Sequence, residues 1–333
     1  MFRCFTFLMV TATFLFVSCN EGPPMKPNAT GKAGEVCIVI EKPDWEGELG
    51  SAFKATLAQD YPFLPQSEPL FTLFNIPNSM FRNIFQSHKN LVLVSISPDF
   101  SEAQMVIQEN VWAAPQIVVT FSGPNDLSIL ACLEQQSQRL INALEQAERN
   151  RGIASAKRYE EKGLRLLSND SFGGSPYFPS GYSLKKQDKN FIWITSETTY
   201  TTKGLLIYSY PYIDSSSLST KVMLKECTDM MQREVPGPLD NTYMTIYSQI
   251  EPAFRWIRFN NRDFTELRGH WEVENDYMGG PFISHFYHDV PNSRVLILTA
   301  FVYAPKYDKR DYLRQVESIL YSFEWVADQD DMK

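Results

Sequence analysis

The 333-residue sequence has no excess of positive charge, few cysteines and no long apolar run beyond its first 19 residues. Lys and Arg number 31 against 39 Asp and Glu, which argues against a polybasic nucleic-acid binder. Five cysteines in a chain of this length exclude a disulfide-stapled mini-protein, and the shortage of apolar runs excludes a polytopic membrane protein. A hydrophobic content of 44% excludes disorder, and the length allows two domains of about 100–200 residues each.

Motifs that carry common enzyme chemistry are also missing. The sequence has no GxSxG nucleophile elbow, no GxxxxGK[ST] phosphate loop, no GxGxxG after a strand and no HExxH zinc motif. It has no CxxC pair that would indicate redox or zinc chemistry. The sequence therefore assigns no catalytic residue, no cofactor and no metal.

The N-terminal segment is the most informative part of the chain. Arg3 precedes an apolar stretch over residues 5–17, and Cys19 follows shortly after it. A membrane-spanning helix needs about 20 apolar residues, so this run fits a secretory signal better than an anchor. It resembles a bacterial lipoprotein signal, in which the cysteine after the cleavage site receives acyl chains, with Phe16 in place of the usual Leu. We expect removal of residues 1–18 and lipidation of Cys19; the alternative is an uncleaved short anchor.

The segment after the signal predicts a flexible tether. Residues 19–34 are rich in Pro and Gly and have almost no large apolar side chain, so they cannot offset their ordering entropy by burial. Removal of residues 1–18 takes away one positive charge and changes the formal charge from −8 to −9. A net-negative body argues against nucleic acid or an anionic headgroup as the main partner. Three cysteines remain beyond Cys19, so at least one of them is free: Cys37, Cys132 and Cys227.

Residues 35–150 predict an N-terminal α/β domain. The apolar run LVLV at 91–94 is continuous rather than alternating, which is typical of a strand covered on both faces. A helix is predicted over 126–150, because apolar residues recur at three- and four-residue spacing behind the capping residue Asn125. We expect a sheet backed by helices.

Residues 151–178 predict a helical connector and a boundary loop. Six Lys and Arg lie between residues 149 and 165, and the stretch SNDSFGGSPYFPSGYS at 168–183 is dense in turn-forming residues. We interpret the basic connector as a solvated helix between domains; docking on a partner or on anionic lipid is the alternative.

Residues 179–326 predict a C-terminal domain, followed by an acidic tail at 327–333. Strand-like runs separated by short turns are joined by amphipathic helices near 217–234 and 308–321. Neighbouring strands on short loops imply an antiparallel sheet with helices on its faces. The predicted fold class is α+β, with two helix-backed, mainly antiparallel sheet domains, the second an α/β/α sandwich.

Ligand-type side chains concentrate in the segment 270–289, HWEVENDYMGGPFISHFYHD. Three of the four histidines lie here together with four carboxylates. A hairpin that turns around 276–281 would place Glu272 opposite His285 on one face. The candidate ligand- or partner-binding residues on that face are His270, Glu272, His285 and Tyr287.

Three interpretations of this hairpin stay open. It forms a groove for a polar ligand or a partner, or a catalytic metal or acid–base site that uses Glu272 with His270 and His285, or a structural hairpin whose alternation alone creates one buried and one polar face. His288 falls on the face opposite His285, so a zinc triad of the three histidines would need a β-bulge.

Several longer segments resemble a known family. They are PDWEG at 43–47, LPQSEPLF at 64–71, PGPLDNTYM at 236–244, RGHWEVENDYMGGPFISH at 268–285 and VYAPKYDKRDYLRQVESILYSFEW at 302–325. Together with the lipoprotein-type start, they resemble an uncharacterised lipoprotein family of Bacteroidetes-type bacteria, known as a domain of unknown function. The resemblance implies a cell-envelope lipoprotein with no assigned reaction. The order of elements in the C-terminal half is also similar to the PsbP/Mog1-like α/β/α sandwich, a fold that serves binding and assembly more often than catalysis.

The predicted function is a non-enzymatic binding or assembly module of an outer-membrane lipoprotein, attached to the membrane through Cys19. The expected partner is an envelope protein or a small polar ligand, and not nucleic acid. The competing hypothesis is a metal-dependent or acid–base hydrolase that uses the 270–288 hairpin.

Overall fold

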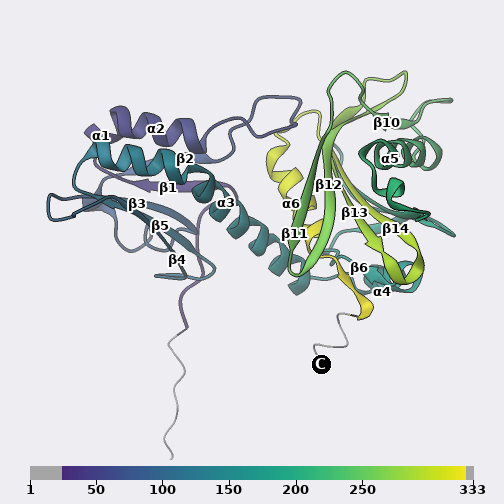
Figure 1. Cartoon of the computed structure of the whole chain (residues 1–333), viewed down its shortest axis with the longest axis horizontal. Coiled ribbons are helices and arrows are strands. Elements are labelled where there is room, and N and C mark those ends of the chain that lie inside the picture. The colour runs from purple at the N-terminus through teal and green to yellow at the C-terminus, as the bar shows by residue number, and fades with distance from the viewer. Residues whose placement is uncertain (1–24, 328–333) are drawn as a thin grey trace, which may run out of the picture.

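The computed structural model describes residues 25–327, which form two lobes joined by a long helix (Figure 1). Each lobe contains a β-sheet backed by helices, so the predicted α+β class is confirmed. The predicted signal (1–18), Cys19 and all but the first residue of the predicted tail (327–333) lie outside the described residues.

The first lobe is built on a five-stranded sheet in the order β2-β1-β3-β5-β4. Its strands are β1 (Glu35–Val39), β2 (Thr72–Ile76), β3 (Asn90–Ile96), β4 (Gln104–Glu109) and β5 (Ile117–Gly123). Strands β1, β2, β3 and β5 pair in parallel, and β4 alone is antiparallel. This sheet is therefore mainly parallel, in contrast to the mainly antiparallel pairing expected. The continuous apolar runs of β1, β3 and β5 are the sequence pattern that parallel pairing produces.

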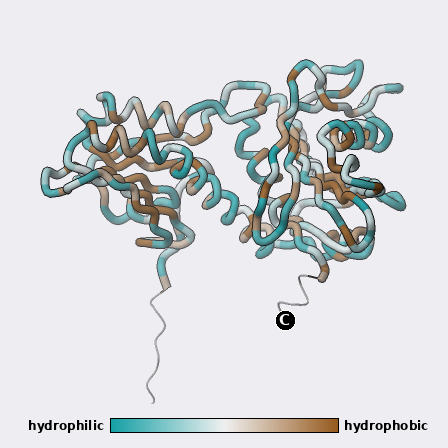
Figure 2. The backbone as a smooth tube through the Cα atoms, in the orientation of Figure 1, coloured by the Kyte–Doolittle hydropathy of each residue, from teal (hydrophilic) through white to brown (hydrophobic). Residues whose placement is uncertain are grey.

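Helices cover one face of the first sheet. They are α1 (Lys42–Glu46), α2 (Glu48–Leu57) and the first half of α3 (Asp126–Arg158). Phe53 of α2 and Leu133 of α3 pack with Val92 and Phe121 of the sheet in the main apolar core, and hydrophobic residues concentrate along these strands (Figure 2). A coil segment, including the short 3-10 helix η1 (Asn78–Met80), lies over the other face.

The second lobe is built on an antiparallel eight-stranded sheet. Its order is β10-β12-β13-β14-β9-β8-β7, with β11 paired to β12. The strands are β7 (Ser183–Asp188), β8 (Phe191–Glu197), β9 (Thr202–Pro211), β10 (Met244–Ile246), β11 (Ala253–Phe259), β12 (Arg262–Val273), β13 (Gly279–Asp289) and β14 (Arg294–Tyr303).

Helices pack on both faces of this second sheet, as the sandwich prediction required. Helix α5 (Thr220–Glu234) buries Met223 and Cys227 against one face. Helix α6 (Arg310–Tyr321) buries Leu313 and Val316 against the other. The remaining elements are α4 (Lys162–Phe172), η2 (Ser215–Leu218), η3 (Val290–Asn292), and the strand pair β6 (Gly174–Ser175) and β15 (Glu324–Trp325).

Helix α3 connects the lobes. It begins at the capping box of Asn125 and Ser128 and runs for 33 residues, about 50 Å, past the end predicted at residue 150. It packs against α6, and one apolar cluster runs from the first sheet through α3 and α6 into the second sheet. The two lobes are therefore fixed to each other by a shared core.

Part of the predicted tether belongs to the first lobe. The backbone N–H of Ala29 donates to Ala114 (3.0 Å), and that of Thr30 donates to Ser87 (2.8 Å). Within residues 19–34, the chain is thus hydrogen-bonded to the lobe from about residue 27 onward.

The predicted register of the 270–288 hairpin is wrong by six residues. His285 lies opposite Glu266, and Glu272 lies opposite Gly279. The reason is that the turn is made by residues 274–278, with Asn275 at a positive φ of 62°, so the glycines are strand residues rather than turn residues. The strand needs glycine at position 280, because a Cβ there would lie only 2.1 Å from a carbonyl oxygen of β14.

Two further features concern the described residues only. No helix within 25–327 is both long and apolar enough to cross a bilayer. The thiols of Cys37, Cys132 and Cys227 are all free, and those of Cys37 and Cys227 are buried.

Candidate functional site in the cleft between the lobes

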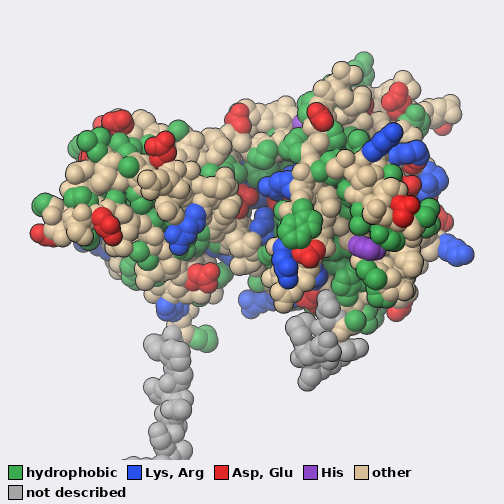
Figure 3. Space-filling view, viewed as in Figure 1, with side chains coloured by type: hydrophobic (Ala, Val, Ile, Leu, Met, Phe, Trp, Pro, Cys, Tyr) green, Lys and Arg blue, Asp and Glu red, His purple; other side chains and the backbone are tan. Residues whose placement is uncertain are grey.

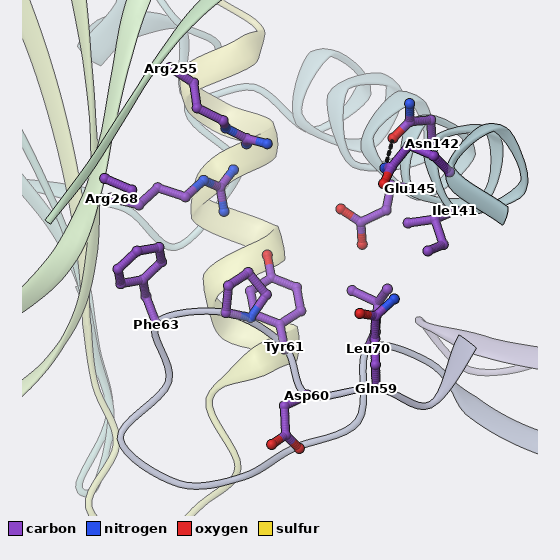
Figure 4. A pocket seen from close by; sticks show the side chains of 13 residues that line it. Gln59, Asp60, Tyr61, Phe63, Leu70, Ile141, Asn142, Glu145, Arg255 and Arg268 are labelled. Carbon is purple, nitrogen blue, oxygen red and sulfur yellow. Dashed lines mark hydrogen bonds between the residues drawn. The ribbon is translucent and has the colours of Figure 1, made fainter. Parts of the chain in front are cut away.

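A cleft of about 350 Å³ lies where the two lobes meet (Figure 4). Three parts of the chain form its walls: the segment 59–70, the middle of α3, and strands β11 and β12. Arg255 and Arg268 point from the strands toward α3, and Tyr61 lies between the two sides. Figure 3 shows basic side chains on the second lobe's side of this junction.

The first wall is a loop that is fastened to α6. The backbone N–H of Tyr61 donates to the carbonyl of Glu68 (2.8 Å), which closes the loop on itself. The buried Glu68 carboxylate accepts hydrogen bonds from the backbone N–H groups of Lys309 (2.6 Å) and Arg310 (2.8 Å). A carboxylate at a helix N-terminus satisfies otherwise free N–H groups and interacts favourably with the helix dipole. The wall is therefore in place without a ligand.

The second wall is one face of α3. Gln138, Asn142 and Glu145 follow each other at four- and three-residue spacing, so they project from the same side of the helix. The Gln138 amide donates to Asn142 Oδ1 (2.8 Å), and Glu145 accepts from Arg314 Nη2 on α6 (2.6 Å). Ile141 adds an apolar surface between them. This wall offers amide groups rather than unpaired charges.

The third wall is formed by two arginines on neighbouring strands. Arg255 lies opposite Glu266 in the pairing of β11 with β12, and Arg268 follows Glu266 on the same face of β12. Both guanidinium groups donate to Glu266 at 2.7 Å. Arg268 is buried, whereas the side chain of Arg255 is 59% exposed and faces the cleft. Arg255 is thus the cation that a ligand would meet.

Behind this wall, a buried network joins elements of both lobes. Arg268 also donates to Glu317 of α6 (2.6 Å), which accepts from Arg149 of α3 (3.0 Å) and from the Tyr61 hydroxyl (3.3 Å). Burial alone would raise the pKa of Glu317, but the Arg268 and Arg149 guanidiniums lower it to about 2. The pKa of Glu266 is likewise held well below its usual range, because the charge of Arg268 outweighs the effect of burial. Both carboxylates are ionised and paired at neutral pH.

The charges that line the cleft balance. Two carboxylates, Asp60 and Glu145, face two guanidiniums, Arg255 and Arg268. The remaining lining combines amides with apolar groups such as Phe63. Pockets with mixed walls and a few placed polar groups are typical ligand sites, and a volume of about 350 Å³ is near the lower end of their range. The cleft suits a small, uncharged polar molecule.

Two of the four predicted site residues line a neighbouring shallow pocket. His270 and Glu272 border a hollow of about 410 Å³ together with Tyr247 and Tyr277. The His270 ring packs against Phe63 (6.4 Å between ring centroids), so it backs the loop of the cleft. Burial lowers the pKa of His270, and burial with the charge of a nearby carboxylate raises that of Glu272.

The other two predicted residues, His285 and Tyr287, lie in the core beneath α6. His285 is 0% exposed, its Nε2 lies 3.4 Å from Glu266 Oε2, and its Nδ1 lies 3.3 Å from the Tyr287 hydroxyl. Burial lowers the pKa of His285. Side chains alternate between the two faces of a strand, so a register shift of an even number of residues leaves each side chain on its face. All four side chains therefore share one face of the sheet, as predicted. However, His270 lies four residues along β12 from the Glu266–His285 pair, about 13 Å away. The structure does not bring His270, Glu272 and His285 to one pocket.

Several residues of the network were not found from the sequence. Glu266 and Arg268 precede the His-rich segment, and Glu317 occurs in a helix whose dominant sequence pattern is its apolar stripe. The alternation of β12 was the available signal, because it places Glu266 on the same face as Glu272. A hairpin centred three residues earlier in the sequence would have paired Glu266 with His285.

The basic connector also has a different role from the one expected. Three of its six basic side chains pair with carboxylates of the C-terminal elements: Arg149 with Glu317 (3.0 Å), and Lys157 and Arg165 with Glu324 (2.7 and 3.4 Å). These contacts tie α3 and α4 to the C-terminal elements α6 and β15. The connector therefore fastens the lobes together.

No cluster of three or more His, Cys, Asp or Glu in the part of the chain described, residues 25–327, has the geometry to hold a metal ion. These residues therefore provide no set of metal ligands that supports or tests the hydrolase hypothesis.

Comparison with known proteins gives two family matches. Residues 29–157 match a model described as a domain of unknown function (DUF8532), and residues 159–322 match another described as a domain of unknown function (DUF4837). The border between the two matches coincides with the C-terminal end of α3 at Arg158. No curated protein matches the chain.

Similarity to solved structures is weak. The Ran-binding protein Mog1p of Saccharomyces cerevisiae has a TM-score of 0.32 at 9% identity, with 46% of this chain and 90% of that chain covered. The lipid transfer and protein localization domain of human StarD13 has a TM-score of 0.23 at 10% identity, with 49% and 95% covered. The chain thus consists of two consecutive regions that each match a model of a domain of unknown function.

Proposed function

We propose that the protein is a non-enzymatic binding module of the cell envelope, held at the outer membrane by acyl chains on Cys19. Its interdomain cleft binds a small, uncharged polar ligand. The observation that carries this proposal is the cleft itself, whose three walls are fixed by buried contacts before any ligand arrives.

Preformed walls favour binding because little ordering entropy is lost when the ligand enters. The loop 59–70 is fixed by Glu68, and the α3 wall is fixed by the shared core and by the Glu145–Arg314 pair. The strand wall is fixed by the Arg268–Glu266 pair, in which both side chains are buried. Arg255 and the amides of α3 are left to contact the ligand.

The placement of the candidate catalytic residues supports binding over hydrolysis. A general base must reach the substrate, or a water on it, within hydrogen-bonding distance. His285 is enclosed by Glu266, Tyr287 and the ring of Phe264, 4.3 Å away between centroids. Glu272 lies on the rim of a different, shallow pocket. An acid–base pair of these side chains would need a large rearrangement of β12.

Attachment through Cys19 is supported by the sequence pattern alone and is tested by intact mass. The full chain, expressed in a bacterium that processes lipoproteins, should be recovered in the outer-membrane fraction with residues 1–18 removed and a mass increase for acyl chains. A Cys19→Ala variant should keep its signal and lose the added mass. Recovery of the wild-type chain with an unmodified Cys19 would refute the lipid anchor.

Ligand binding in the cleft is tested with a pair of matched variants. Asn142 lies in the cleft and accepts from Gln138; Asn150 is exposed on the same helix and accepts from Gln146 in the same way (2.7 Å). We expect wild type purified in mild detergent to carry a bound mass in native mass spectrometry. Asn142→Trp should fill the cleft and abolish that mass, and Asn150→Trp should keep it. Equal retention in both variants would refute the cleft as the binding site.

A further inference from the structure

Among residues 25–327, no α-helix covers one face of the first sheet, although parallel sheets are normally covered by helices on both faces. Cys37, Val39, Leu91 and Val118 form a buried apolar cluster on this face. The residues packed over it belong to the coil segments 78–89 and 110–116. A thin coil layer therefore replaces the helices that cover the opposite face.

This coil layer presents apolar side chains to the outside. Ile84 is 70% exposed and Met80 is 48% exposed. Next to them, Phe81 and Trp112 are half-buried and contact each other edge to face, with 5.2 Å between ring centroids. Aromatic and aliphatic side chains that project from one surface mark an interaction site more often than scattered single residues do.

The charge of the same surface is opposite to that of the whole chain. The segments 25–32, 78–89 and 110–116 contain Lys26, Lys32, Arg82 and Lys89 and no Asp or Glu, in a chain of net charge −8. The nearest carboxylates by sequence and contact are three, and the first is Glu41, which accepts a hydrogen bond from the backbone N–H of Asn78 (3.1 Å). Glu35 is paired with His88 (3.2 Å), and Glu109 precedes the third segment. The surface is therefore locally basic as well as apolar.

The chain enters the first lobe at this surface. Residues 27–30 are hydrogen-bonded between Ser87 and Ala114, which lie in the two coil segments. Figure 3 shows basic and hydrophobic side chains at this end of the lobe, where the described chain begins. Cys19 precedes Pro27 by eight residues, which span at most about 28 Å when fully extended. An acyl group on Cys19 would hold this surface within that distance of the bilayer.

We propose that this basic, apolar surface, formed by segments 25–32, 78–89 and 110–116, docks on an anionic lipid bilayer. The inference rests on the proposed anchor at Cys19 for its natural tether. Ile84, Met80 and Trp112 enter the headgroup region, and the four basic side chains contact anionic headgroups. The first sheet then faces the membrane, and the interdomain cleft is held at a fixed orientation above it.

The test replaces the natural anchor so that docking is measured independently of acylation. A chain of residues 19–333 with Cys19→Ser, Cys132→Ser and an N-terminal His-tag is tethered to nickel-chelating lipid in phosphatidylcholine–phosphatidylglycerol vesicles. An environment-sensitive fluorophore is attached at Ile84→Cys or, as the matched control, at Ile213→Cys, an isoleucine that is 84% exposed on the second lobe. Doxyl-labelled lipid should quench the probe at 84 several-fold more than the probe at 213. Equal quenching at both positions would overturn the proposal.

The basic contribution is measured with the untethered chain. Arg82→Gln should weaken partition onto the phosphatidylglycerol vesicles about fivefold at low salt, the effect expected for one basic residue. Arg258→Gln, which removes a 64% exposed arginine from the second lobe, should leave partition unchanged. Equal effects of the two variants would also overturn the proposal. The two proposals can fail separately. If the native chain is acylated at Cys19 but the tethered chain does not dock, the docking surface is refuted and the anchor stands. If the tethered chain docks but Cys19 of the native chain is unmodified, the anchor is refuted and the docking surface stands.

Discussion

Replacement of Arg268 by Met is expected to destabilise the protein by about 3–5 kcal/mol, the cost of leaving a buried charge without its partner. Arg268 donates to Glu266 at 2.7 and 3.1 Å and to Glu317 at 2.6 Å. The side chains of Glu266 and Glu317 are 0% and 4% exposed, so water cannot replace the guanidinium. In the variant, Glu266 would retain Arg255 and Glu317 would retain Arg149. The loss of stability should therefore stay within this range.

Urea unfolding measures this loss. With a slope of about 3 kcal/mol per molar urea, the midpoint should fall by roughly 1 M or more. Arg258→Met is the matched control, because its exposed pair with Asp263 at 3.8 Å is expected to contribute less than about 1 kcal/mol. Adding Glu317→Gln to Arg268→Met should restore part of the stability by removing one of the unpaired charges. A midpoint for Arg268→Met equal to that of Arg258→Met would refute the idea that the network holds the lobes together.

Three further predictions concern pH, backbone space and thiol reactivity. Burial lowers the pKa of His285 in the folded protein, so this histidine takes up a proton at a higher pH in the unfolded chain than in the folded one. As the pH falls below about 6.5, protonation therefore favours the unfolded chain, and the free energy of unfolding should drop. His285→Gln should give a shallower decline of the thermal midpoint between pH 7 and 5, and an unchanged slope would contradict this. Gly280→Ala should destabilise, because its Cβ would lie 2.1 Å from a carbonyl oxygen, whereas Gly163→Ala in open space should gain up to about 1 kcal/mol; calorimetry showing equal effects would refute the difference. Iodoacetamide should modify half-buried Cys132 in the native protein and spare Cys37, whose pKa burial raises to about 12; native modification of Cys37, mapped by peptide mass, would contradict its burial.

Local patterns predicted most of the elements. The terminal helix was expected over 308–321 and is found over Arg310–Tyr321, because its apolar stripe has a clear helical period. The helix after Asn125 was found at its predicted start but extends to Arg158. Its second half has weaker apolar periodicity, because it packs between two lobes and pairs its basic side chains with Glu317 and Glu324.

Features that depend on contacts distant in sequence could not be derived. The parallel pairing of β1 with β3 joins residues more than 50 positions apart, and apolar composition alone does not give strand direction. The cleft combines a loop near residue 60, α3 and strands near residue 260. The partnership of Arg268 with Glu317 depends on the docking of α6, so no sequence spacing indicates it. The prediction of the hairpin register was wrong for a local reason: a turn at 274–278 and a turn at 276–281 are both compatible with the positions of its glycines.

Site-specific photo-cross-linking in living cells tests the binding cleft most directly. A photoreactive amino acid is placed at Asn142 inside the cleft or at Asn150 outside it on the same helix, in the full chain with its own signal. A ligand bound in the cleft should give an adduct of defined mass at position 142 and none at position 150. The absence of any adduct at position 142, or identical adducts at both positions, would contradict the claim that the lobes enclose a ligand-binding site.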